Sequence, residues 1–410
     1  MNRTLRSPVL LLGIAALSLV TACGAAMRPT TSTSKGTTDP TASATVPFAT
    51  PFATPAQVTL SPTPTVPFAT PFATPAQATL SPTPTDPPTS SPTPSPSPAP
   101  QAAVTLYSIA TYSSVAHLHL GPDGALWFTT EGMGSNEFGK ITPAGVVTTW
   151  PLPWASGGGD MSDFTFGGGF LWSTDVHGLN DSYIGQWTIT GKLVHEFPVP
   201  WTAYAITWGP DGTLWFSGAL VSGMELDLSY VGSMTVDGVV TTYYLPDTSD
   251  LAGGLTAGPD GDIWFSEDPG SHVGRVTTSG AITEYEVPHS ENIGGPIGDN
   301  QTITVGPDGA IWAIVDNALV KVTTSGTVSV VAAASPHSVS TNPDGDVWYT
   351  TTSPPTGASV VRLSTSGVPV ADYSIGDHEL TVVTTGGDGM IWFGDDGDIA
   401  RLDPSIPPNS

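Results

Sequence analysis

The stretch GPDGDIWF, Gly258 to Phe265, indicates how this chain folds. Its Pro-Asp-Gly segment is a turn signal, because proline presets the first turn position, aspartate bonds to its own backbone and glycine accepts a positive φ. The residues that follow are β-branched and aromatic, which is typical of a strand. The stretch therefore predicts a β-hairpin turn together with the second strand of the hairpin.

The same pattern recurs along the chain around seven tryptophans. One copy, FGGGFLW ending at Trp172, lacks the Asp-Gly turn. The tryptophans are Trp127, Trp172, Trp215, Trp264, Trp312, Trp348 and Trp392. Successive members are 45, 43, 49, 48, 36 and 44 residues apart. A period of about 44 residues built from short strands predicts an all-β fold, a seven-bladed β-propeller with four-stranded blades.

A second marker follows the tryptophans, a Ser-Gly or Ala-Gly turn and an alternating strand, as in VGRVTTSGAITEYEVP from Val273. Each blade is thus expected to contain an inner strand, a tryptophan strand, a third strand and an edge strand. The segment 104–110 resembles an edge strand without a blade, and the last blade ends near Leu402 after its third strand. We expect the N-terminal strand to complete the last blade, because this leaves no exposed sheet edge. The repeated tryptophans are expected in the core.

The segment 1–23 is predicted to be a lipoprotein signal peptide. Basic residues precede an apolar run, 9–20, that is too short to span a bilayer comfortably. The sequence VTAC that ends at Cys23 resembles a bacterial lipobox, and Cys23 is the only cysteine. Lipidation there would attach the exported protein to the outer face of the cell membrane, because two or more acyl chains bind a membrane firmly. The lipid anchor would be the only part of the protein that contacts the membrane. The alternative is an ordinary signal peptide with an incidental cysteine.

The segment 24–103 is rich in Pro, Thr and Ser and is predicted to be a disordered linker. The sequence VPFATPFATPAQVTLSPTPT at 46–65 repeats at 66–85 with one change. Such a composition cannot bury a core. At about 3.1 Å per residue its extended length is roughly 250 Å, enough to lift a domain off the membrane. The propeller is expected over 104–404, followed by a short tail, 405–410.

The chain is strongly acidic, with a formal net charge of −26. The segment 104–410 carries 34 acidic and six basic residues. A surface of this kind repels phosphate, which argues against nucleic acid as a partner. It serves either to keep the protein soluble or to bind divalent cations.

A single cysteine allows no disulfide framework, so the blades must be held together by packing. We also expect the protein to be a monomer.

Propeller geometry predicts where a site would form. The start of each first strand, the end of each second strand and the connections between blades meet at one end, the top face, and the Asp-Gly turns lie at the other. The turn aspartates are interpreted as turn chemistry only. On the top face we expect Tyr204, His337, Trp154 and Trp201 to line a pocket for a small molecule or a cell-surface partner. The alternative for each is packing within its loop. Acidic residues that follow the tryptophans at this end are Glu131, Glu267, Asp268, Asp395 and Asp396.

The strings GPDGxxWF and GRxTTSGxITEYxVP resemble the blades of the virginiamycin B lyase family, the streptogramin lyases, over 104–404. The resemblance implies a carbon–oxygen lyase that opens the ester linkage of a cyclic peptide antibiotic by magnesium-dependent elimination. The family has Pro-His eleven residues before the penultimate tryptophan, and this histidine contacts the substrate. His337 matches it.

The last blade of the family carries Glu-x-His, in which the glutamate binds magnesium and the histidine accepts the proton. Glu379 matches the glutamate, and Thr381 stands at the position of the base. A second magnesium-binding glutamate lies four residues after the last tryptophan, where this chain has Asp396. The resemblance therefore implies a Mg²⁺ site formed by Glu379 and Asp396.

The loss of the histidine matters because elimination needs a neutral base with a pKa near the working pH beside the cation. Threonine cannot serve. His378 immediately precedes Glu379, and in an extended strand it would point to the opposite face. It could replace the base only if the strand is bulged there or the alignment slips by three residues, so His378 on the same side as Glu379 would favour an enzyme. We consider a surface propeller that binds a ligand or partner without elimination, a working lyase or other metal-dependent enzyme, and an acidic structural head on a spacer.

Overall fold

The structure is a computed structural model. It describes residues 104–109, 114–131, 137–154, 159–222, 225–246, 250–268, 271–288, 302–332, 335–342, 344–353 and 357–408. The predicted signal peptide with Cys23 and the predicted linker lie outside these residues. Within them, no helix is long and apolar enough to cross a membrane.

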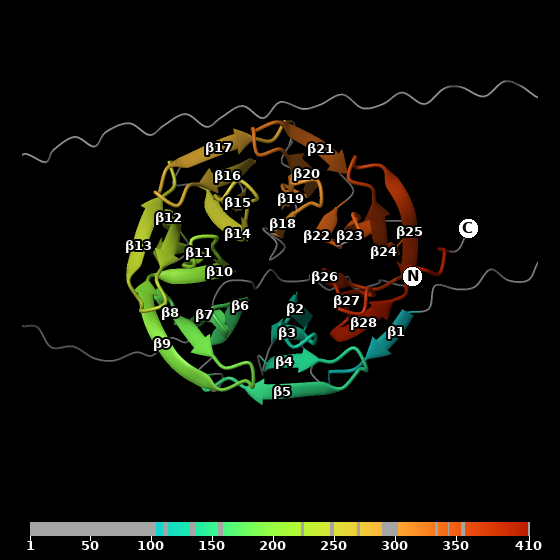
Figure 1. The fold of residues 1–410 in the computed structure, drawn as a ribbon, viewed down its shortest axis with the longest axis horizontal. Coiled ribbons are helices and arrows are strands. Elements are labelled where there is room, and N and C mark those ends of the chain that lie inside the picture. Colours follow the sequence, from blue (N-terminus) through green and yellow to red (C-terminus); the bar gives the residue numbers. More distant parts are fainter. Residues whose placement is uncertain are drawn as a thin grey trace, which may run out of the picture. The chain divides into compact units, whose positions relative to one another are not determined.

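Seven four-stranded antiparallel sheets form a closed ring of blades around a central axis, which confirms the predicted seven-bladed propeller (Figure 1). Blade 1 comprises β2 (Ser114–Leu120), β3 (Leu126–Glu131), β4 (Glu137–Ile141) and β5 (Val147–Pro151). Blade 2 comprises β6 (Asp160–Gly167), β7 (Phe170–Gly178), β8 (Asp181–Trp187) and β9 (Leu193–Pro200). Blade 3 comprises β10 (Thr202–Trp208), β11 (Leu214–Ser222), β12 (Glu225–Met234) and β13 (Val240–Tyr244).

The remaining blades follow in chain order. Blade 4 comprises β14 (Leu251–Ala257), β15 (Ile263–Asp268), β16 (His272–Val276) and β17 (Ile282–Glu286). Blade 5 comprises β18 (Ile303–Val305), β19 (Ile311–Val315), β20 (Ala318–Val322) and β21 (Val328–Ala332). Blade 6 comprises β22 (Pro336–Thr341), β23 (Val347–Ser353), β24 (Gly357–Leu363) and β25 (Pro369–Gly376). Blade 7 comprises β26 (Leu380–Thr385), β27 (Ile391–Asp395), β28 (Asp398–Leu402) and β1 (Val104–Tyr107).

The N-terminal strand closes the ring, as expected. β1 pairs with β28 in antiparallel register, from Val104 opposite Leu402 to Tyr107 opposite Ile399. The ring of Tyr107 stacks on Trp392 at a centroid distance of 5.3 Å. The strand is shorter than the segment 104–110 that the sequence suggested. The pairing gives blade 7 its fourth strand and covers the edge that β28 would otherwise expose.

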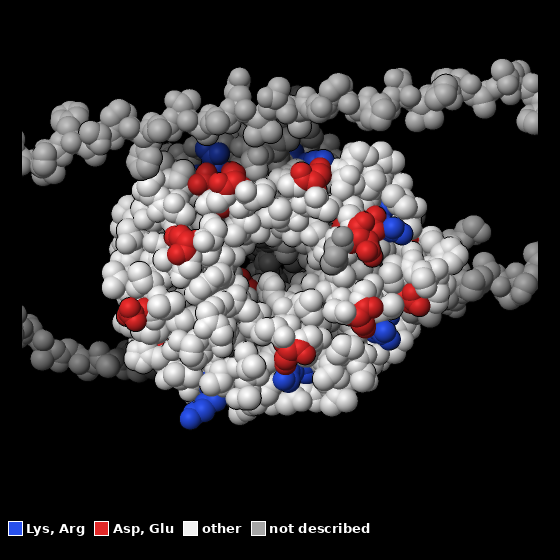
Figure 2. Space-filling model, viewed as in Figure 1, with Lys and Arg blue, Asp and Glu red and all other residues white. Residues whose placement is uncertain are grey.

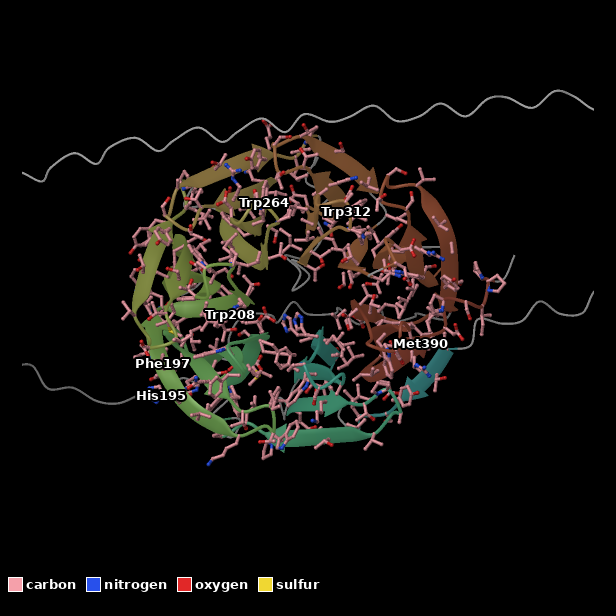
Figure 3. All side chains as sticks on the ribbon, viewed as in Figure 1. His195, Phe197, Trp208, Trp264, Trp312 and Met390 are labelled. Carbon is pink, nitrogen blue, oxygen red and sulfur yellow. The ribbon has the colours of Figure 1, made fainter. Side chains whose placement is uncertain are left out.

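The core lies between neighbouring blades, and the repeated tryptophans are its largest members. All seven are at most 1% exposed. Trp264 of blade 4 packs with Ile311 and Val320 of blade 5, and Trp312 packs in the same way against blade 6 (Figure 3). Each tryptophan therefore joins its own blade to the next, which is how the ring holds without a disulfide.

The aspartates of the Asp-Gly turns have a second role that the sequence interpretation missed. Asp123 accepts a hydrogen bond from the amide of Ala125, as turn chemistry requires, but also from Trp127 Nε1 at 3.0 Å and from Lys140 Nζ at 2.7 Å. Lys140 Nζ also lies 4.9 Å from the centroid of the Trp127 ring. The aspartate thus orients the core tryptophan and balances the cation over it.

The same stacking of a cation on the repeat tryptophan recurs in other blades. The further pairs are Arg275 with Trp264, Lys321 with Trp312, Arg362 with Trp348 and Arg401 with Trp392. Acidic and basic side chains accordingly stand next to each other around the face drawn in Figure 2, where the ring is hollowed at its centre. These few basic residues are held in place at the turn ends of the blades.

Candidate functional site

The inner strands carry a β-bulge close to the predicted top face. Pro336 pairs with Thr351 and Ser338 with Thr350, so His337 is the extra residue of β22. In β26 the register shifts between Leu380 and Val383. The same irregularity occurs in β2, β6, β10 and β14. Because a bulge re-aims the side chain it contains, the positions about eleven residues before six of the seven tryptophans differ from ordinary strand positions.

His337 is half-buried at the bulge of blade 6. Its Nε2 lies 2.7 Å from Thr352 Oγ1. Burial lowers the pKa of His337, and the negative charge of Glu379 acts in the opposite direction. The net lowering favours a neutral imidazole at neutral pH, which can both donate and accept a hydrogen bond. Glu379, on blade 7, is thus close enough to act on His337 of blade 6.

Thr381 connects three blades. Its hydroxyl donates to the backbone carbonyl of Val115 in blade 1 at 2.7 Å, and its own carbonyl accepts from Thr350 Oγ1 in blade 6 at 3.0 Å. Gly394 leaves the space for this arrangement, since a Cβ there would come within 2.1 Å of the Thr381 hydroxyl. Thr381 therefore ties blade 7 to the blades on both sides of it.

Glu379 and Asp396 meet at one end of the β26–β27 hairpin, as predicted. The amide of Glu379 donates to Asp396 Oδ1 at 2.8 Å, and the amide of Asp396 donates to the Glu379 carbonyl at 3.1 Å. Asp396 has a φ of 48°, in the left-handed region. Both side chains are exposed. The hairpin geometry thus places the two predicted magnesium ligands side by side through their backbones.

His378 lies against the same end of the hairpin. Its Nδ1 is 2.8 Å from Asp395 Oδ1 and 3.1 Å from Asp396 Oδ2. His378 and Glu379 both precede β26, which starts at Leu380, so the alternation of an extended strand does not apply to them. The expected orientation of His378 rested on that alternation, and the structure instead gathers it with the carboxylates.

The three side chains of His378, Asp395 and Asp396 form a group of possible metal ligands. One ligand atom from each lies within 4.8 Å of the others, and Glu379 is not a member of this group. Burial raises the pKa of Asp395, the neighbouring His378 acts to lower it, and the charges of Asp396 and Asp398 add to the rise. Two carboxylates and an imidazole that can move aside fit a divalent cation with water in its remaining positions.

The predicted aromatic pocket residues lie in different surroundings. Trp154 contacts His177 and Trp187 of blade 2, at centroid distances of 4.6 and 5.8 Å. Trp201, with a φ of 58°, contacts Tyr230 and Tyr244 of blade 3. Both tryptophans lie in connections between blades and contact residues of the blade that follows.

Tyr204 is half-buried in the bulge of β10, and burial raises the pKa of its hydroxyl. A pocket that Tyr204 shares with His337 stays a prediction. A cavity of about 390 Å³ lies elsewhere, near the outer turns of blades 5 and 6, and Lys321, Thr327 and Gly367 are among its lining residues.

The sequence profile of the virginiamycin B lyase family matches residues 102–402, from β1 to the end of β28. The chain belongs to the virginiamycin B lyase family. A streptogramin B lyase structure is 25% identical, with 73% of this chain and 97% of that chain covered and a TM-score of 0.60. Virginiamycin B lyase from Staphylococcus aureus, in selenomethionine form, is 26% identical, with 73% and 99% covered and a TM-score of 0.58. No curated protein matches this chain.

A third solved relative shares the propeller fold. It is a catalytically inactive histidine-to-alanine variant of the Staphylococcus aureus enzyme, solved with quinupristin. It is 24% identical, with 74% of this chain and 99% of that chain covered and a TM-score of 0.59, so this likeness shows the fold.

Sequence reasoning named Asp395 only as one of several acids and allowed His378 a place in the site only if the strand were bulged or the alignment slipped by three residues. The sequence did contain a signal for this group of ligands. His378 lies fourteen residues before Trp392, and Asp395 lies three residues after it. Those positions lie close together at one end of the hairpin, where Asp395 is opposite Leu380. A search for ligand-type residues at such paired positions would have found this group within the virginiamycin B lyase repeat.

Proposed function

We propose that this member of the virginiamycin B lyase family binds a streptogramin-like cyclic peptide on its top face and does not open it. The observation that carries the proposal is the hydrogen bond from Thr381 Oγ1 to the Val115 carbonyl. A threonine hydroxyl has no basic form near neutral pH, and this one already donates its proton to the backbone. Elimination requires a proton acceptor at that place.

The binding half of the proposal rests on His337. It matches the substrate-contacting histidine of the family, and its bulge position and its lowered pKa keep a neutral imidazole at the inner strand of blade 6. The relative solved with quinupristin shows that a variant of the Staphylococcus aureus enzyme described as catalytically inactive is found with such a ligand. Binding and turnover are therefore separable on this fold.

Magnesium would be held at the end of blade 7 by Asp396 with Asp395 and His378, or by Asp396 with Glu379 after a side-chain rotation. A cation there would supply positive charge that polarises an oxygen of the bound peptide. Asp396 accepts the amide of Glu379, so the backbone of the hairpin fixes the position of this carboxylate.

A second candidate function, a working lyase, is favoured by one contact. His378 Nδ1 is 2.8 Å from the buried carboxylate of Asp395. A carboxylate that orients an imidazole beside a cation is the arrangement of a general base. In this alternative His378, three residues from Thr381, would take over the task of the missing histidine.

The test uses quinupristin as the probe, with magnesium present. Calorimetry is expected to detect binding, and chromatography with mass detection is expected to find the peptide ring intact. His337→Ala should weaken binding, whereas the exposed Asp237→Asn, in a turn of blade 3, is the matched control. Ring opening that disappears in His378→Asn would overturn the proposal in favour of the lyase. Absence of binding would overturn both.

We further propose that the protein is an exported lipoprotein, anchored through Cys23 to the outer face of the cell membrane and acting there as a monomer. The support is the lipobox-like sequence before Cys23 and the Pro/Thr/Ser-rich segment 24–103. A propeller on such a tether would meet an antibiotic outside the cell, where binding without turnover can still lower the free concentration.

A further inference from the structure

Blade 4 contains a second group of possible metal ligands, away from blade 7. Asp250 precedes β14, Glu267 lies in β15 and His272 begins β16. Asp250 is 5% exposed and Glu267 is 1% exposed, while the imidazole of His272 is about one-third exposed. One ligand atom from each lies within 4.8 Å of the others. Three different segments of the blade therefore converge on one point that is accessible to solvent through His272.

The distances in this group suit a shared ion better than hydrogen bonds. His272 Nδ1 is 3.7 Å from Asp250 Oδ2 and 3.8 Å from Glu267 Oε2. A separation of this size is too long for a hydrogen bond from the imidazole. Two ligands about 2.1 Å from one ion in tetrahedral geometry are about 3.4 Å apart, so a small closure of the group would bring all three into coordination.

The charge of the group also points to a cation. Two carboxylates are buried, and the single imidazole can supply at most one positive charge. Arg275 is the only Lys or Arg of the blade, and its guanidinium lies 3.7 Å from Asp260 and 3.5 Å from Asp262, at the Asp-Gly turn. A divalent cation bound among these side chains would offset the repulsion between the two buried carboxylates.

The backbone of blade 4 makes room for the buried carboxylate. A Cβ at Gly274 would come within 2.6 Å of Glu267 Oε1. Asp250 and Glu267 stand fourteen residues before and three residues after Trp264, which are the positions of His378 and Asp395 relative to Trp392. The propeller thus presents ligand-type side chains at the same paired positions of two blades.

We propose that Asp250, Glu267 and His272 bind a divalent transition-metal ion, with Zn²⁺ or Mn²⁺ as the class that suits two carboxylates and one imidazole. Three protein ligands leave at least one position for water or for a group of a bound molecule. The ion would clamp the segment that enters blade 4 to the β15–β16 hairpin. This site is separate from the proposed magnesium site of blade 7 and does not depend on it.

The experiment measures metal binding directly, on protein stripped with chelator. Calorimetry with Mn²⁺ gives the number of sites, and the visible absorption of added Co²⁺ reports a nitrogen ligand. The variants are Glu267→Gln and His272→Asn in blade 4, with Asp395→Asn in blade 7 as the matched control. We expect Glu267→Gln to weaken one site at least tenfold, His272→Asn to change the Co²⁺ spectrum, and Asp395→Asn to leave this site unchanged.

A second readout guards against loss of folding in the variants. Zn²⁺ should raise the midpoint of thermal unfolding of the wild type, because an ion that binds only the folded state stabilises it. His272→Asn, at a position that is about one-third exposed, should fold normally and lose most of this shift. The same number of sites with the same affinities in both blade 4 variants as in the wild type, or no transition-metal binding by the wild type, would overturn the proposal.

Discussion

The hydroxyl of Thr381 donates to the carbonyl of Val115, 2.7 Å away in the neighbouring blade. The two residues are far apart in sequence and meet where the last blade joins the first. The bond ties the inner strand of blade 7 to that of blade 1, where the ring closes.

Thr381→Val is expected to lower the free energy of unfolding by about 1–2 kcal/mol, since it leaves the Val115 carbonyl without its donor in a partly buried position. Thr381→Ser keeps the hydroxyl and should lose clearly less. Urea unfolding followed by tryptophan fluorescence measures both. Equal stability of the valine and serine variants would show that the bond contributes nothing.

Tyr107→Ala should destabilise the closure of the ring by about 2 kcal/mol, because a half-buried aromatic side chain loses its stacking on Trp392. Leu106, in the same strand, is 52% exposed, and Leu106→Ala should change stability by less than about 0.5 kcal/mol. Thermal unfolding compares the two. A larger effect at Leu106 than at Tyr107 would contradict the role assigned to the stacking.

Asp123→Asn should destabilise the protein at neutral pH and matter little in acid. Burial acts to raise the pKa of Asp123, but hydrogen bonds from Lys140, Trp127 and the Ala125 amide outweigh it, and the pKa is lowered. A lowered folded-state pKa gives stability that is present above the unfolded pKa, about 3.9, and is lost as pH falls through the folded value. We expect Asp123→Asn to lower the free energy of unfolding by about 1 kcal/mol at pH 7. Denaturant unfolding of wild type and variant at pH 7 and at pH 3 measures this, and the difference between them should be small at pH 3.

Asp175→Asn should have the opposite effect on stability at neutral pH and raise the free energy of unfolding. Asp175 is fully buried in blade 2, and burial, with the nearby charges of Glu196 and Asp160, raises its pKa well above the usual range, although Ser173 opposes the shift. Its folded form therefore binds a proton more tightly than its unfolded form, and wild-type stability falls as pH rises above about 4.

The asparagine variant mimics the protonated carboxyl and should gain stability relative to wild type between pH 4 and pH 7. Asp237→Asn, in an exposed turn, is the control. Denaturant unfolding across this pH range is the measurement. A variant that is less stable than wild type at every pH would show that Asp175 is ionised and useful in the fold.

Cys23→Ser should release the protein from membranes into the medium, because the acyl chains proposed as its anchor can no longer be attached. Fractionation of cells that express the two forms, with immunodetection, measures the shift. Substitution of a linker residue, Thr65→Ser, should leave the distribution unchanged. Retention of the Cys23→Ser protein on membranes would show that another segment holds it.

The sequence by itself determined the architecture. Seven copies of a turn followed by a tryptophan strand, at a period of about 44 residues, predict a seven-bladed propeller. The unpaired strand at Val104 indicated how the ring closes. It also placed Glu379 and Asp396 at one end of one hairpin, because that follows from their spacing around Trp392. Both predictions concern residues whose positions follow from their distance in sequence to the repeated turns and tryptophans.

Only the tertiary structure decided what the polar side chains do. The partner of Thr381 lies in the first blade, the imidazole of His378 reaches Asp395 because the chain has not yet become a strand there, and Asp250, Glu267 and His272 converge from three segments. Trp154 and Trp201 contact aromatic residues of blades 2 and 3, and the pocket expected of them stays a prediction. Bulges, chain bends and contacts between blades set the orientation of these side chains, and the period of the repeat predicts none of these features.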